Sequence, residues 1–316
     1  MSSNRAFAAA GSLGLATTLL TFALIVIGSV VRTTGSGLAC PDWPLCQGQL
    51  IPPLESHVLI EWFHRLIALL VSLLVVATAA WTFSQGAVRA RLGMLAILSV
   101  ALLFAQVMLG ALTVWKLLDP SIVSGHLAVA LLLFATLITY TMTASAHGEE
   151  PSVSSTPRPA ALLPWIAVAT ALTYLQALLG GVVSTHHAGL ACPEWPTCNG
   201  EWFPPLDGLV GIQMLHRYGA YLLTLVLLVV ATLSRTSANP GVRAGGQLAL
   251  TLMVAQVVLG VCNVFLGTPV WLSAAHLATA VVLLAVLLAT TFRVARLPRA
   301  IAEAHTPDPA VGEMAR

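Results

Sequence analysis

Four histidines with matched neighbours are the residues of this 316-residue chain best suited to chemistry. His64 and His216 each precede an arginine, and His126 and His276 each begin the tripeptide His-Leu-Ala. Neutral imidazole is the commonest metal ligand in proteins. Two imidazoles that face each other across a helical bundle can hold a haem iron from both sides. The pattern therefore predicts two haem-type sites, each built from a pair of these histidines.

Two other interpretations of these histidines remain open. A histidine within a membrane helix can act only as a hydrogen-bonding contact between helices, which is also the role we expect for Gln106 and Gln256. However, ionisable residues inside membranes are rare and usually functional, and four at matched depth favour the ligand interpretation. Zinc is disfavoured, because no carboxylate or cysteine lies in the helical register needed to complete a tetrahedral set.

Glu61 marks an informative difference between the two histidine-arginine motifs. It precedes His64 by three residues and therefore lies on the same helix face, whereas Gln213 stands at that place before His216. A carboxylate beside one histidine pair and an amide beside the other suggests that one site does chemistry while the other holds a permanent cofactor. The alternative is that Glu61 only forms an ion pair with the arginine after His64. The two arginines are candidate contacts for haem propionates, or cations that extend toward lipid headgroups: Arg65 and Arg217.

Two cysteine pairs share the spacing C-x5-C, namely Cys40/Cys46 and Cys192/Cys198. The spacing is neither that of a zinc knuckle nor that of a thioredoxin-like site. A structural disulfide within each short loop is the favoured interpretation, and a redox-active dithiol that passes electrons to a nearby cofactor is the alternative. The fifth cysteine, Cys262, replaces Leu112 of the other half and is expected to act as a small apolar residue.

The composition shows what must position these residues. Hydrophobic residues make up 58% of the chain and charged residues only 8%, about a third of the charged fraction of a soluble domain. This excludes a soluble enzyme, a disordered protein and a nucleic-acid binder. Uncharged runs long enough to cross a membrane predict eight transmembrane helices: 6–31, 66–83, 92–115, 121–143, 161–184, 211–234 and the long run 244–292, which the turn residues 267–269 divide into two.

An internal duplication orders these helices. The sequence GLACPDWPLC at 37–46 returns as GLACPEWPTC at 189–198, an offset of 152 residues, and the later histidine motifs repeat at an offset of 150. We therefore expect an all-α integral membrane protein made of two tandem four-helix bundles, 1–147 and 161–316, joined by a linker at 148–160. Because each half contains an even number of spans, the halves should be related by pseudo-two-fold symmetry along the membrane normal.

The basic residues predict the orientation. If the N-terminus is cytoplasmic, ten of the 14 Lys and Arg residues lie inside and four outside, in line with the positive-inside rule. The C-terminus is then cytoplasmic as well, and both cysteine loops lie outside, where disulfides persist. The inside set is Arg5, Arg89, Arg91, Arg158, Arg235, Arg243, Arg293, Arg296, Arg299 and Arg316, and the outside set is Arg32, Arg65, Lys116 and Arg217.

Together, residues 35–46, the run Glu61-Trp62-Phe63-His64-Arg65 and the three later histidine motifs resemble the haem A synthase family, in its bacterial type with paired loop cysteines. The resemblance extends from about residue 15 to about residue 293, with no departure at these positions. It implies an oxidoreductase of the bacterial cell membrane that oxidises the C8 methyl of haem O, through a hydroxymethyl stage, to the formyl group of haem A for terminal oxidases.

The resemblance also implies site roles and partners. His216 and His276 would hold a resident haem b, and His64 and His126 would flank the substrate haem O, with Glu61 as the catalytic carboxylate. The loop cysteines would form the disulfides Cys40–Cys46 and Cys192–Cys198. Haem O would come from haem O synthase, a protohaem farnesyltransferase. The electron partner, the oxygen source and any homo-oligomer are left open, and nucleic acid is not a partner.

Two other classes of protein fit the same four histidines. A di-haem b-type electron-transfer cytochrome would hold two permanent haems, and Glu61 would then be incidental. A haem transporter or chaperone would need neither an electron partner nor a carboxylate at the site. The haem content of the purified protein discriminates between them, since an enzyme should carry one permanent haem and a variable amount of substrate or product.

Overall fold

The computed structural model describes residues 2–147, 159 and 161–298, and these residues form eight long helices. Each helix is long and apolar enough to cross a membrane, which confirms the eight predicted spans. The helices are α1 (Ser3–Thr33), α2 (Ser56–Ser84), α3 (Gly86–Trp115), α4 (Pro120–Ser145), α5 (Leu162–Thr185), α6 (Gly208–Arg235), α7 (Pro240–Phe265) and α8 (Val270–Ala295), with a short 3-10 helix, η1 (Ala188–Leu190), after α5.

The helix that carries His64 begins earlier than we expected. The second span was predicted from the uncharged run at 66–83, whereas α2 begins at Ser56. Glu61 and Arg65 form an ion pair one helical turn apart, with 2.5 Å between Oε1 and Nη2. Because the two charges compensate each other, the helix continues through them. The predicted division of the last apolar run is confirmed, because Gly267 and Thr268 both have positive φ in the turn between α7 and α8.

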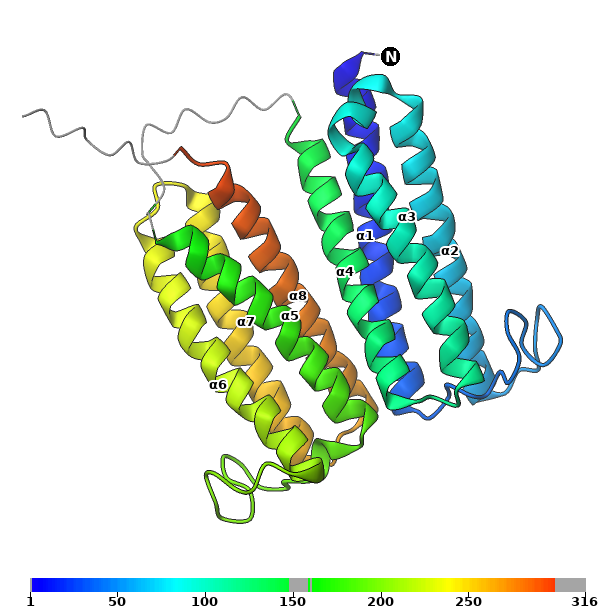
Figure 1. Ribbon diagram of the computed structural model, residues 1–316, viewed down its shortest axis with the longest axis vertical. Helices are drawn as coiled ribbons and strands as arrows, with labels where there is room; N and C mark the ends of the chain where they lie inside the picture. The colour runs from blue at the N-terminus through cyan, green and yellow to red at the C-terminus, as the bar shows by residue number, and fades with distance from the viewer. Residues whose placement is uncertain (1, 148–158, 160, 299–316) are drawn as a thin grey trace, which may run out of the picture.

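The helices form two groups of four that stand side by side (Figure 1). Within the first group, α1 and α3 each pack against both α2 and α4, which therefore occupy opposite corners; α5 to α8 repeat this arrangement. The groups meet through α1, α4, α5 and α8. Both loops that contain cysteine pairs lie at the end opposite the N-terminus (Figure 1). The pseudo-two-fold axis and the domain limits stay predictions, and most of the proposed linker lies outside the described residues.

An apolar layer closes each group two helical turns beyond its histidines. Four residues, each seven positions after one of the histidines, are at most 2% exposed. They belong to two separate clusters, one within each group of helices. They are Val71, Leu133, Leu223 and Leu283. The histidines themselves are half-buried, so this apolar layer is packed more tightly than the level of the histidines.

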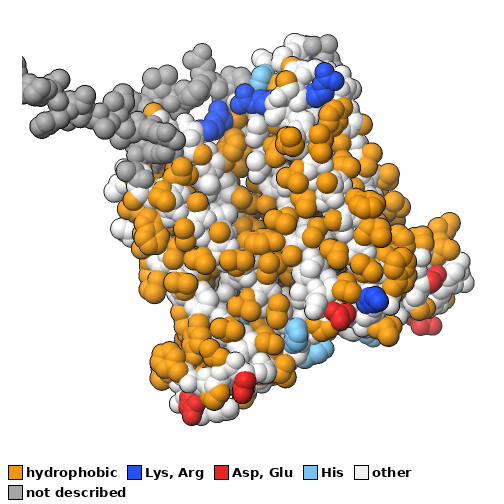
Figure 2. Space-filling view, in the orientation of Figure 1, with side chains coloured by type: hydrophobic (Ala, Val, Ile, Leu, Met, Phe, Trp, Pro, Cys, Tyr) orange, Lys and Arg blue, Asp and Glu red, His pale blue; other side chains and the backbone are white. Residues whose placement is uncertain are grey.

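Charged side chains gather at the two ends of the molecule and leave an apolar belt between them (Figure 2). On the face shown, the end that carries the N-terminus displays Lys and Arg without Asp or Glu, whereas the loop end displays mainly Asp and Glu. This distribution agrees with the charge asymmetry from which the orientation was predicted.

Candidate functional site

The four histidines lie at matched depths from the loop end. His64 and His216 each stand eight residues after the first residue of their helix, and His126 and His276 each stand six residues after it. At 1.5 Å per residue, these positions lie about 12 Å and about 9 Å from the helix ends. Each group of helices therefore carries one histidine on each of two opposite corners, at nearly one level.

The rings of His216 and His276 have the spacing of two axial ligands. Their centres are 6.4 Å apart and their planes are inclined by 69°. Two metal–nitrogen bonds of about 2 Å in line, plus two ring radii of about 1 Å, would separate the ring centres by about 6 Å. In the part of the chain that the structure describes, no group of three or more His, Cys, Asp or Glu side chains could hold a metal ion. The ring spacing of His216 and His276 fits two imidazole ligands on one metal ion, as in a haem held from both sides.

A glycine on the preceding helix supports each imidazole. A methyl group placed on any of these four glycines would come within 3.1–3.3 Å of a histidine Cε1 atom, closer than ordinary van der Waals contact. Glycine thus lets the edge of each ring rest against the neighbouring helix. The four contacts are Gly28–His64, Gly110–His126, Gly180–His216 and Gly260–His276.

The hydrogen-bond partners of the imidazoles differ between the groups. Gln176 Nε2 lies 3.0 Å from His216 Nδ1 and also donates to the main-chain oxygen of His216 at 2.7 Å. Gln106 Nε2 lies 3.2 Å from His126 Nε2. In contrast, the Nδ1 atoms of three histidines are buried without a partner: His64, His126 and His276. Gln106 makes the predicted interhelical contact, and it makes that contact with a candidate ligand.

Both predicted disulfides are present. Cys40 is joined to Cys46 and Cys192 to Cys198, with Cα atoms 4.6 and 4.9 Å apart. All four of these cysteines are at most 1% exposed. Cys262 is the free cysteine of the described residues. A redox role for the loop cysteines stays a prediction.

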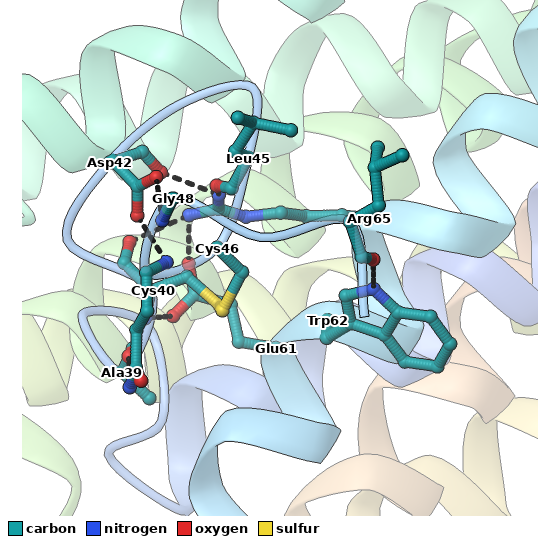
Figure 3. Close-up of a disulfide and its surroundings, with 11 residues drawn as sticks. Ala39, Cys40, Asp42, Leu45, Cys46, Gly48, Glu61, Trp62 and Arg65 are labelled. Atoms are coloured by element: carbon teal, nitrogen blue, oxygen red, sulfur yellow. Dashed lines mark hydrogen bonds and ion pairs between the residues drawn. A yellow bond between two sulfur atoms is a disulfide. The ribbon is translucent and has the colours of Figure 1, made fainter. Parts of the chain in front are cut away.

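The first disulfide loop is bound to α2 by Glu61 and Arg65 (Figure 3). Glu61 is 4% exposed, and its Oε2 accepts a hydrogen bond of 2.8 Å from the main-chain N–H of Cys40 while Oε1 pairs with Arg65. The Arg65 guanidinium donates to the main-chain oxygens of Cys40, Asp42 and Leu45. The ion pair that we considered as the alternative role of Glu61 is therefore formed. It fixes the disulfide loop at the end of α2 that carries His64.

The second loop is bound by the corresponding arginine but without the carboxylate. Arg217 donates to the main-chain oxygens of Cys192 and Thr197 at 2.7 and 2.8 Å. Gln213 Nε2 donates to the main-chain oxygen of Gly189 at 3.3 Å, and its Oε1 is buried without a partner. Both arginines predicted to contact propionates thus hold loop carbonyl groups.

Each loop also ties itself together through an acidic residue. Asp42 accepts hydrogen bonds from the main-chain N–H groups of Gln47 and Gly48, and Glu194 accepts one from Gly200. The bond from Gly48 is the main reason why the pKa of Asp42 lies below its ordinary value.

The glycines and Gln176 were not among the site residues predicted from the sequence. The glycines repeat with the histidines that they support, Gly28 with Gly180 at an offset of 152 and Gly110 with Gly260 at an offset of 150. Aligning the two halves in full would therefore have found them. Gln176 has Leu24 as its counterpart, so only the structure connects it with His216.

Comparison with known proteins supports a common origin for this arrangement. The family model COX15-CtaA, described as cytochrome oxidase assembly protein, matches residues 12–288. The chain is 34% identical to a haem A synthase of Symbiobacterium thermophilum over 79% of this chain and 83% of the relative. It is 32% identical to a haem A synthase of Shouchella clausii (80% and 85% covered) and 30% identical to one of Halalkalibacterium halodurans (84% and 91% covered).

Proposed function

The chain belongs to the COX15-CtaA family of cytochrome oxidase assembly proteins, and from that membership we propose that it is a haem A synthase. It is an oxidoreductase that converts the C8 methyl of haem O, through a hydroxymethyl stage, into the formyl group of haem A. The single observation that carries this function is the match to haem A synthases over about four fifths of the chain. The four supported histidines provide the ligands that such an activity requires.

The two halves divide the work. His216 and His276 hold a resident haem b, a proposal supported by their ring spacing of 6.4 Å and by the contact of Gln176 with His216. A bound haem b supplies one-electron redox chemistry. His64 and His126 flank the substrate haem O in the other half. There, neither histidine has a partner on Nδ1, whereas His216 has Gln176, and a pair without this support suits ligands that must bind and later release their haem.

The protein's own residues position the substrate and handle protons. The glycines hold the edges of the imidazole rings in place. The buried residues Val71 and Leu133 close the bundle on the side of the histidines that faces away from the disulfide loops. Converting a methyl to a formyl group adds one oxygen atom and removes hydrogen from the carbon, so protons must leave the site and electrons must pass to an acceptor. Glu61, one turn before His64, is the carboxylate that can stabilise positive charge at the substrate edge or accept a proton, a contribution typically worth about 10²–10⁴-fold in rate. Arg65 and the Cys40 N–H hold it in place.

We further propose the protein's location and partners. It lies in the bacterial cell membrane with both termini in the cytoplasm and both disulfide loops outside, as the basic residues favour. Haem O synthase supplies the substrate. Arg65 and Arg217 contact haem propionates in addition to the loop carbonyls, because a guanidinium has five N–H donors and neither arginine uses its Nε in these contacts.

A di-haem electron-transfer cytochrome is the second candidate, and the near-identical support of all four histidines favours it. Mass spectrometry of the haems in host membranes, with and without the intact gene, separates the two functions. We expect haem A to disappear and haem O to accumulate without the protein. Unchanged haem A in the deletion strain would contradict the synthase function and favour the cytochrome.

A further inference from the structure

Arg32 stands on the helix α1 that contacts His64, and it has no assigned role. It stands in the last turn of α1, four residues after Gly28, whose backbone rests against the His64 ring. Residues four apart share one helix face, so Arg32 lies one turn closer to the loop end than the His64 contact. Because side chains lean toward the N-terminus of their helix, the Arg32 side chain leans back toward the level of His64.

Arg32 lacks the protein partners that occupy the neighbouring arginines. Its Nε is buried without a hydrogen bond. The ion pair found among the described residues joins Glu61 to Arg65, and Arg65 and Arg217 both donate to loop carbonyls. A guanidinium nitrogen buried without an acceptor is costly, so an unpartnered Nε on the helix face that contacts His64 points to an anion that arrives with the ligand.

Arg32 also belongs to one half only. At the offset of 152 residues that relates Gly28 to Gly180 and His64 to His216, the residue matching Arg32 is Ser184. The glycine, the histidine and the disulfide loop are therefore duplicated, but this cation is not. Two simpler explanations apply to an arginine at this place: it compensates the helix dipole at a C-terminus, or it extends toward a lipid phosphate.

We propose that Arg32 binds a carboxylate of the substrate, which under the proposed function is a propionate of haem O. This inference rests on the proposed function, since it requires a haem with free carboxylates in the first half. Arg32 would then fix which edge of the macrocycle faces outward and hence where the reacting methyl group lies. A guanidinium suits this role because it binds carboxylates through two parallel hydrogen bonds.

The test measures binding of haem O and of its dimethyl ester to the purified full-length protein that carries its resident haem. The protein is kept in dodecyl maltoside micelles, which contain no phosphate, and binding is followed through the spectral change that His64→Ala removes. In the wild type, we expect esterification to weaken binding about 10- to 100-fold, the range for a hydrogen-bonded charged group. In Arg32→Gln, haem O should bind several-fold more weakly while the ester binds as it does to the wild type, so that the preference for the free acid falls to what the contact with Arg65 provides.

A matched control is Lys116→Gln, which removes an exposed cation at the loop end of the same half and should preserve the preference for the free acid. Arg32→Met keeps the apolar stem and serves as a second uncharged variant if Arg32→Gln does not insert. Equal weakening of acid and ester in either variant would assign Arg32 to folding and overturn the proposal. An Arg32 effect seen only when phospholipid is added would assign it to a lipid phosphate and also overturn it. Wild-type protein that binds no second haem would instead refute the proposed function itself.

Discussion

The two halves share a scaffold but differ in the polar residues that surround it. Both contain a disulfide loop fixed by an arginine, two imidazoles resting on glycines and an apolar layer two turns below. The first half adds Glu61 and Arg32, where the second has Gln213 and Ser184, and only the second places an amide, Gln176, beside the Nδ1 of its first histidine. The duplicated residues place the same kind of histidine pair in each half. Under the proposed function, the residues that are not duplicated would decide whether a haem stays in its half or reacts.

Removing a ligand from the second half should have the largest effect. His216→Met and His276→Met are both expected to change the low-spin spectrum of the resident haem, because each removes one of two imidazoles whose rings are 6.4 Å apart. His64→Met, the matched change in the first half, should leave that spectrum as it is. Optical and electron paramagnetic resonance spectra of the purified proteins measure this. An unaltered low-spin signal in both second-half variants would show that the resident haem lies elsewhere.

Glu61→Gln makes the first half resemble the second at one of the positions where they differ in charge. We expect turnover to fall by about 10²–10⁴-fold, with haem O or its hydroxymethyl derivative accumulating and haem still bound. The matched exchange Gln213→Glu should change turnover little. Extraction of haems followed by mass spectrometry is the measurement. Normal haem A yield from Glu61→Gln would leave the carboxylate only its contacts with Arg65 and Cys40.

Gln176→Leu gives the second half the leucine that the first half has at Leu24. Losing a side chain that bonds a ligating histidine typically costs about 10- to 100-fold in affinity, so the resident haem should dissociate faster and its reduction potential should shift. Transfer of haem to apomyoglobin measures the dissociation rate. The reverse change, Leu24→Gln, should slow release from the first half. Identical release rates in wild type and Gln176→Leu would mean that the amide does not distinguish the sites.

The glycines should matter equally in both halves. Gly180→Ala and Gly28→Ala each place a methyl group 3.1–3.2 Å from a histidine Cε1, and overpacking of this kind costs about 1–3 kcal/mol. We expect lower haem occupancy in the half that carries the change. Gly125→Ala is the control, because its methyl group meets open space and Ala275 already occupies the matching position. Comparable haem loss in the control would show that the effect is not specific to the histidine contact.

The smallest contrast concerns the loops, which should behave alike. Thiol labelling of the unreduced protein should modify Cys262 and none of the four loop cysteines. Peptide mass spectrometry after alkylation reads this directly. Labelling of one loop but not the other in fully active protein would break the equivalence of the halves and favour a redox role for the labelled pair.

The sequence predicted the parts of this protein that repeat. Long uncharged runs and a fixed offset are visible without any structure, and so are histidines with matched neighbours. The start of α2 was placed too late because charged residues usually end an apolar run, whereas here Glu61 and Arg65 neutralise each other within the helix. The contact of Gln176 with His216 and the unpaired state of Arg32 depend on how neighbouring helices are rotated, which the apolar pattern does not specify.

The seam between the two groups of helices uses equivalent positions from both. One apolar cluster contains residues of the first half together with the residues that match them in the second. The pairs are Leu127 and Leu277, Leu131 and Val281, Phe134 and Leu284, Ile138 and Leu288, and Phe22 and Tyr174. Exchanging the halves also turns the contact of α4 with α5 into that of α8 with α1. Matching positions on both sides are what an isologous interface has, so these pairs are in line with the predicted pseudo-two-fold relation. A chain built like a fused homodimer lets each copy acquire residues such as Arg32 and Gln176 without changing the other.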